Sequence, residues 1–110
     1  MTDREYLELA AKAAGVELLW TRGGHPVNVP TLFKGMGSDE VWNPLEDDGD
    51  ALRLAVKLRK MPVIERWSDG HDWVFIPGHE GGALPLGNDP LAATRRAIVR
   101  AAAEIGRSMA

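Results

Sequence analysis

The sequence predicts an α+β domain, a three-layer α/β/α sandwich in which three helices cover an antiparallel sheet of about four strands. Three segments carry apolar residues at helical spacing. Short apolar runs separated by turn residues stand between them, which gives the order α-β-β-α-β-β-α. A hairpin near residue 70 has apolar residues on both faces, and this pattern favours cover on both sides. A length of 110 residues fits a single domain, residues 1–110.

The composition is that of a globular domain and excludes several classes of protein. Charged residues make up 26% and the net charge is −3, so a generic basic nucleic-acid binder is excluded. The chain has no cysteine, which excludes a disulfide framework and a thiol nucleophile and favours a reducing cytosol. No apolar run is long enough to span a bilayer, and residues 1–15 lack the layout of a signal peptide. We therefore expect a cytoplasmic domain without membrane contact.

The first predicted helix begins at a capping box, in which Thr2 and Glu5 each satisfy the other's backbone N–H. It ends before Gly15, because glycine readily takes a positive φ. Two short strands follow, at residues 17–21 and 27–29. Prolines flank the second strand and cannot donate to a ladder, which confines that strand to a sheet edge or a bulge.

The second predicted helix has two possible starts. Asn43 could be its N-cap, or Asp47 or Asp48 could cap a helix that begins near Gly49. Apolar residues cover more than half of the helical wheel from residue 51 to 58, so we expect this helix to be the most buried. Acidic residues before it and basic residues at its end complement the helix dipole.

Asp69-Gly70 between the apolar runs 63–67 and 73–76 predicts a hairpin with a two-residue type I′ turn. One face of that hairpin would carry Ile64, Arg66, Trp73 and Phe75, and the other Val63, Glu65, Trp67, Val74 and Ile76. We expect Trp67 and Trp73 to lie in the core, although a longer turn would change the pairing.

Residues 78–88 are rich in glycine and are predicted to be irregular. Asp89 is a good N-cap and Pro90 a good first residue for the last helix, which runs nearly to residue 110. Its expected core stripe consists of Leu91, Thr94, Ile98, Ala101, Ala102, Ile105 and Met109. Abundant alanine allows this helix to approach a neighbour closely.

Three residues are candidates for binding a partner. Trp42 stands beside a helix cap and could anchor another protein, although tryptophan more often packs in a core. His79 and Glu80 lie in the glycine-rich segment, where a solvated side chain is the ordinary interpretation.

Arg96, Arg100 and Arg107 are the candidates for binding nucleic acid, because one helical face could address phosphates. The simpler interpretation is a solvated face with an ion pair between Arg100 and Glu104 at i, i+4 spacing. The sequence shows neither a helix-turn-helix pattern nor an aromatic platform for stacking bases.

No catalytic, cofactor-binding or metal-binding residues are predicted. Six acids could hold a hard cation such as Mg²⁺ and support a metal-dependent hydrolase, namely Asp39, Glu40, Glu46, Asp47, Asp48 and Asp50. Acids at a helix N-terminus explain this cluster more simply. The three histidines, His25, His71 and His79, all fall in predicted turns or loops.

Three blocks together resemble a known family: Trp42-Asn43-Pro44 with Asp47 to Leu58, the hairpin from Trp67 to Phe75, and Asp89 to Gly106. They are similar to small phage and prophage proteins of the phage ABA-sandwich domain type and to Nin-region proteins of lambdoid phages. The resemblance implies helices on both faces of a sheet and an origin in a phage or prophage, and it implies no catalytic residues. We therefore expect a non-enzymatic accessory protein that binds a host or phage protein in the bacterial cytoplasm. Self-association into a homo-oligomer stays open.

Overall fold

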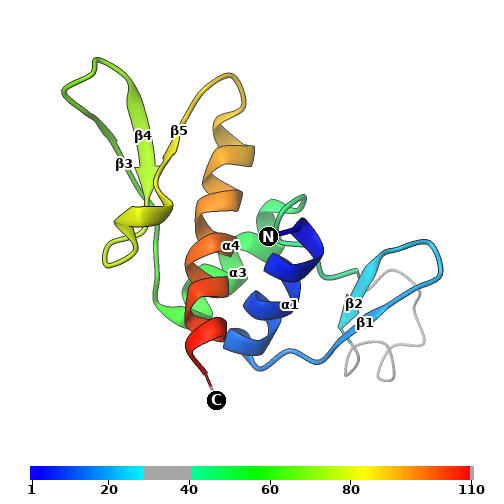
Figure 1. The fold of residues 1–110 in the computed structure, drawn as a ribbon. Coiled ribbons are helices and arrows are strands. Elements are labelled where there is room, and N and C mark those ends of the chain that lie inside the picture. The colour runs from blue at the N-terminus through cyan, green and yellow to red at the C-terminus, as the bar shows by residue number, and fades with distance from the viewer. Residues whose placement is uncertain (29–40, 110) are drawn as a thin grey trace.

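In the residues that the computed structural model describes, 1–28 and 41–109, three helices lie between two small antiparallel sheets (Figure 1). The helices are α1 (Asp3–Ala14), α3 (Asp48–Leu58) and α4 (Pro90–Ser108), with a short 3₁₀ turn, η1 (Glu80–Gly82). The strands are β1 (Leu18–Trp20), β2 (Pro26–Asn28), β3 (Val63–Arg66), β4 (Asp72–Phe75) and β5 (Leu84–Pro85).

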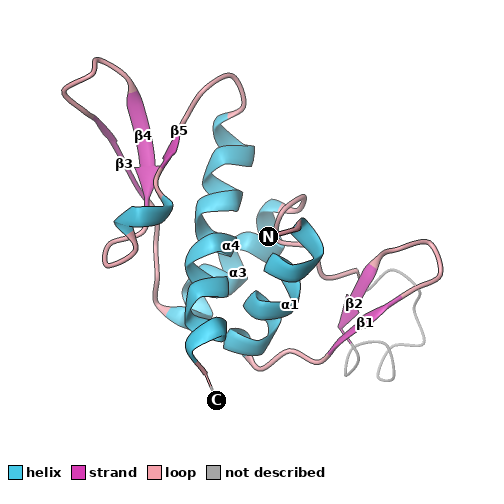
Figure 2. Cartoon of the chain, viewed as in Figure 1, coloured by secondary structure: helices cyan, strands magenta, loops and turns pink. Residues whose placement is uncertain are grey.

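The predicted α+β class and the order of helices and strand pairs are confirmed, but the arrangement of the layers differs. Strand β1 pairs with β2, and β3, β4 and β5 form a separate sheet. The helices occupy the middle and the sheets the two sides (Figure 2), instead of one sheet lying between helices. Strand β5 and turn η1 lie in the segment that we expected to be irregular. Residue 29, at the end of the predicted second strand, falls outside the described residues.

The turn of the β3–β4 hairpin has three residues, where we predicted two. The N–H of Trp67 donates to the carbonyl of His71 at 3.0 Å, and the N–H of Gly70 donates to the carbonyl of Trp67 at 3.0 Å. Gly70 has a φ of 83°, as the third residue of such a loop requires. Val63 is therefore paired with Phe75, one position away from the predicted register.

Because of this one-residue shift, the buried aliphatic side chains lie on one face of the hairpin and the aromatic side chains on the other. Val74 and Ile76 are fully buried on the face that packs against α4. The aromatic side chains all lie on the opposite face. Because the buried aliphatic residues share one face, one helical layer covers them, and the second layer that we predicted is not needed.

Helix α1 begins and ends as predicted. The hydroxyl of Thr2 accepts the N–H of Glu5 at 3.2 Å, and the carboxylate of Glu5 accepts the N–H of Thr2 at 3.3 Å. Hydrogen bonds from the backbone and the hydroxyl of Thr2 lower the pKa of Glu5. Gly15 follows the last turn with a φ of 72°.

Helix α3 takes the second of its two predicted starts. Asp47 is the N-cap, and its Oδ2 accepts the N–H of Asp50 at 2.7 Å. Asn43 instead begins a separate turn, since its carbonyl accepts the N–H groups of Glu46 and Asp47. This polar turn leads into a helix whose two ends are both capped.

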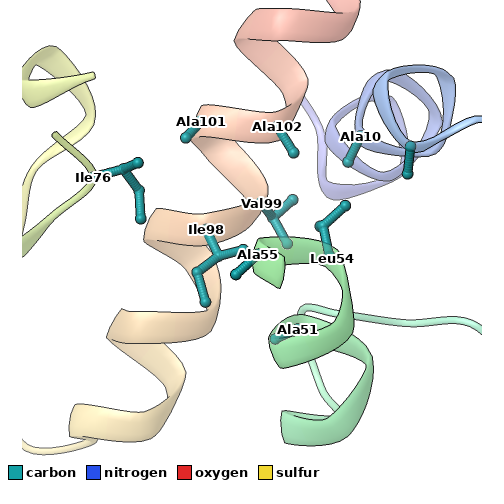
Figure 3. Packing of buried hydrophobic residues seen from close by; sticks show 10 residues of the cluster. Ala10, Ala51, Leu54, Ala55, Ile76, Ile98, Val99, Ala101 and Ala102 are labelled. Carbon is teal, nitrogen blue, oxygen red and sulfur yellow. The ribbon is translucent and has the colours of Figure 1, made fainter. Parts of the chain in front are cut away.

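Helix α4 contacts α1, α3, β4 and β5, and it carries the longest series of buried residues in the described chain. In Figure 3, Ile98 and Val99 of α4 lie between Ile76 and the Leu54 side chain of α3. The prediction that α3 is the most buried helix is wrong. Leu52 of α3, counted in its apolar arc, is 54% exposed because α3 contacts its neighbours over a narrow stripe.

Helices α1 and α4 approach each other at a glycine. A Cβ atom at Gly106 would overlap the carbonyl oxygen of Leu9, so only a residue without a side chain fits between the two backbones. Alanines on both helices line the same contact, with Ala10 and Ala102 almost inaccessible to solvent. Backbone-to-backbone packing of this kind tolerates no added volume.

We predict that Gly106→Ala destabilises the domain by about 1–3 kcal/mol, because the added methyl group separates α1 from α4. This change would ordinarily stabilise a helix interior by about 1 kcal/mol, so the predicted sign is opposite to the helix-propensity effect. Urea unfolding followed by tryptophan fluorescence measures the difference. Gly81→Ala is the matched control, because nothing lies within 4 Å of its Cβ position. An unchanged or raised midpoint for Gly106→Ala would contradict the packing argument.

Candidate functional site

The face of the β3–β4–β5 sheet opposite α4 is the candidate site, and we call it the aromatic face. Strand register places Glu65 opposite Trp73 and Trp73 opposite Pro85. Side chains two positions apart in a strand share a face, which adds the remaining members. The aromatic face consists of Val63, Glu65, Trp67, Trp73, Phe75 and Pro85.

Three aromatic rings form a connected group on this face. The rings of Trp67 and Trp73 are stacked, with 4.8 Å between their centroids and 12° between their planes. Phe75 lies against Trp67 at 6.1 Å with a tilt of 44°. Contacts with these geometries contribute about 0.5–1.5 kcal/mol each beyond area burial. The three side chains are only half-buried, so part of their apolar surface stays open to solvent.

Both indole N–H groups of the stack are held by carboxylates. Nε1 of Trp67 donates to Glu65 at 3.0 Å, and Nε1 of Trp73 donates to Asp69 at 2.9 Å. Asp69 also accepts the backbone N–H of His71 at 2.9 Å, and this hydrogen bond lowers the pKa of Asp69. The rings are therefore fixed in orientation, and neither indole N–H is left to bind a ligand.

Two carboxylates lie next to the aromatic face. Glu65 and Asp69 lie at the edges of the rings. Two residues of the hairpin can carry positive charge: Arg66 lies on the opposite face and pairs with Asp72 at 3.1 Å, and His71 lies in the turn beside Asp69. Apolar rings with two carboxylates therefore define the chemistry of this surface.

The candidates Trp42, His79 and Glu80 do not form one surface. Trp42 is half-buried against the core and lines an open cavity of about 400 Å³ beside Asp50. His79 lines a different cavity of about 350 Å³, where its Nδ1 lies 3.1 Å from Oε2 of Glu104 without making a hydrogen bond. The carboxylate of Glu80 folds back onto the N–H of Gly78 at 2.9 Å.

The candidates Arg96, Arg100 and Arg107 differ in their surroundings. Arg96 binds the carboxylate of Asp3 on α1 at 3.0 Å and so joins two helices. Arg100 and Arg107 line the same cavity as His79. The i, i+4 pair that we considered between Arg100 and Glu104 is absent from the ion pairs of the described residues.

The acidic cluster serves the start of α3. Asp47 is the cap, and Asp48 pairs with Arg95 of α4 at 2.6 Å. Asp50 is almost fully buried, accepts the N–H of Asn43 at 2.9 Å and binds Arg53 at 2.7 Å. Asp39 and Glu40 lie outside the described residues. Within residues 1–28 and 41–109, no group of three or more His, Cys, Asp or Glu side chains is placed to hold a metal ion.

The sequence contained one sign of the aromatic face that our prediction did not use. We expected Trp67 and Trp73 in the core, on different faces of the hairpin, and the structure stacks them on one half-exposed face. Ser68-Asp69-Gly70 suits a three-residue loop with glycine in the left-handed region as well as it suits a two-residue turn. The longer loop places all three aromatic residues together.

Comparisons with protein-family models, curated proteins and solved structures find no match for this chain. The resemblance to phage proteins therefore stays a prediction. Among the described residues, none of the helices combines the length and the hydrophobicity that a membrane crossing needs.

We predict that Mg²⁺ or Mn²⁺ leaves the melting temperature unchanged, because the acids at the start of α3 already have protein partners. A ligand that binds the native state would raise it. Differential scanning fluorimetry with and without EDTA measures the effect. Asp50→Ala provides the comparison, since loss of its hydrogen bonds should destabilise the fold by about 1–3 kcal/mol. A metal-dependent rise in wild-type melting temperature that Asp50→Ala abolishes would restore the metal-site hypothesis.

Proposed function

We propose that this chain is a non-enzymatic protein-binding module and that the aromatic face is its docking surface. The observation that supports this proposal is the Trp67–Trp73–Phe75 group, half-exposed on a sheet face whose other side packs on α4. Buried aromatic anchors supply much of the binding energy in protein interfaces. The stacked rings are already fixed by hydrogen bonds, so little side-chain entropy is lost when a partner binds.

Binding of nucleic acid through α4 is the alternative, and the geometry supports it less. Arg96 is engaged with Asp3 and Arg95 with Asp48. An aromatic platform is present, but the two carboxylates beside its rings would repel a phosphate backbone. A protein surface is therefore the better complement to the aromatic face.

The setting that we propose for this function comes from the sequence. The resemblance to phage ABA-sandwich proteins implies a phage or prophage accessory protein, and the lack of cysteine agrees with work in the cytoplasm of a bacterial host. The proposed partner is accordingly a host or phage protein.

We predict that Trp67→Thr weakens partner binding by about 30-fold or more, because a central aromatic anchor is lost from the interface. Tagged wild-type protein and the variant would each capture proteins from bacterial lysate, with and without nuclease treatment, followed by quantitative mass spectrometry of the bound fraction. A captured protein would then be purified, and its dissociation constant measured by calorimetry. Threonine keeps a high strand propensity at this position.

Trp20→Thr is the matched control, since it makes the same substitution on β1 of the other sheet. The proposal requires a partner whose binding withstands Trp20→Thr and fails with Trp67→Thr, while circular dichroism shows both variants folded. Equal loss in both variants, or equal retention, would contradict docking at the aromatic face. Binding that disappears after nuclease treatment would favour the arginine-bearing helix instead.

A further inference from the structure

We infer that the partner presents an arginine or lysine side chain to the aromatic face, which binds the cation between its indole rings and the carboxylates of Glu65 and Asp69. This inference rests on the proposed function and specifies the chemistry of the partner. It follows from the hydrogen bonds of the rings, from the carboxylates beside them and from the contact of a cation with Trp20 elsewhere in the chain.

The hydrogen bonds at the ring edges and the stacking of the two indoles leave the outer ring faces as the binding surface. Each indole N–H of the stack already donates to a carboxylate, at 3.0 Å for Trp67 and 2.9 Å for Trp73. A carboxylate that accepts an indole N–H also increases the electron density of the ring. The negative potential over the ring face is what attracts a cation, so this arrangement favours a cation over a neutral group.

The carboxylates set the sign of the charge that the face accepts. The backbone N–H of His71 lowers the pKa of Asp69 and so favours its charged form. A purely apolar partner, such as a proline-rich segment, would cover Glu65 and Asp69 without replacing their water, and that desolvation is costly. A guanidinium or ammonium group compensates both carboxylates while it contacts the rings. Charge complementarity therefore selects a basic partner.

The same chain contains this arrangement in completed form at its other sheet. The guanidinium of Arg4 lies over the ring of Trp20 at 4.5 Å from the centroid. The Nε of that arginine is 3.3 Å from the carboxylate of Glu8. At that sheet the protein itself supplies the ring of Trp20, the cation of Arg4 and the carboxylate of Glu8. On the aromatic face, the rings and carboxylates are present, and the hairpin's own Arg66 points to the other side and pairs with Asp72.

Three seven-residue glycine-serine peptides test the inference, with two arginines, two citrullines or a Pro-Pro-Leu-Pro core. Citrulline retains the shape of arginine and removes its charge. Nitrogen–proton NMR spectra report the indole N–H of each tryptophan during titration to about 10 mM peptide, where the weak cation–π contacts of single side chains become measurable. We expect the arginine peptide to shift the signals of Trp67 and Trp73, and citrulline to weaken that binding at least fivefold.

Glu65→Gln tests the contribution of charge, because glutamine can still accept the indole N–H of Trp67. We expect this variant to bind the arginine peptide about threefold more weakly. Glu46→Gln, at an exposed position before α3, makes the same change in net charge and should leave the affinity unchanged. Higher salt should weaken the arginine peptide alone, because its attraction is partly coulombic.

The outcomes separate this inference from the proposed function. Equal binding of arginine and citrulline peptides, or tighter binding of the proline-rich peptide at the same two indoles, overturns the cationic partner and leaves docking at the aromatic face intact. Absence of any shift at Trp67 and Trp73 with the arginine peptide also overturns it. The proposed function fails by a different result, namely captured partners that are indifferent to Trp67→Thr.

Discussion

The close approach of α4 to α1 determines which surface of α4 is left for the elements that pack on it. Gly106 lets the backbone of α4 reach the carbonyl of Leu9, and alanines on both helices extend that contact. With one flank of α4 occupied by α1 and another by α3, the β3–β4–β5 sheet packs on what remains of the α4 surface. The sheet meets α4 with its aliphatic face, and its aromatic face is left to the solvent.

Polar links between distant segments hold this arrangement together and explain why several charged residues are not free for function. Arg96 joins α4 to Asp3 at the start of α1, and Arg95 joins α4 to Asp48 and to the carbonyl of Leu45. In the sequence, Arg96, with Arg95 beside it, belongs to the arginine stripe that we considered for binding phosphates. In the fold they stabilise the N-terminal ends of the two helices that pack on α4, where carboxylates are favoured by the helix dipole.

Features that depend on neighbouring residues were predictable from the sequence, and contacts between residues far apart in the sequence were not. The cap of α1 and both ends of α4 depend on residues within a few positions, and the sequence predicts them correctly. The hairpin was also predictable, but its register depends on whether Gly70 closes a two- or three-residue loop. That choice decides whether Trp67 lies on the same face as Trp73 and Phe75 or on the opposite one. The partners of Arg95 and Arg96 are tens of residues away, so no spacing rule identifies them. The aromatic face was missed for the first reason, and the ion pairs of Arg95 and Arg96 were missed for the second.

An alanine-rich interior gives this domain an unusual relation to temperature. Six of the ten residues in the buried core cluster of the described chain are alanines, and the largest side chain there is that of an isoleucine or leucine. A methyl group exposes little apolar surface when a chain unfolds, and the heat capacity of unfolding rises with the apolar area exposed. The free energy of unfolding should therefore curve gently with temperature, because close backbone contact contributes here what large side chains contribute in other cores. Such a domain is expected to have a broader stability curve than one whose core is built from large side chains.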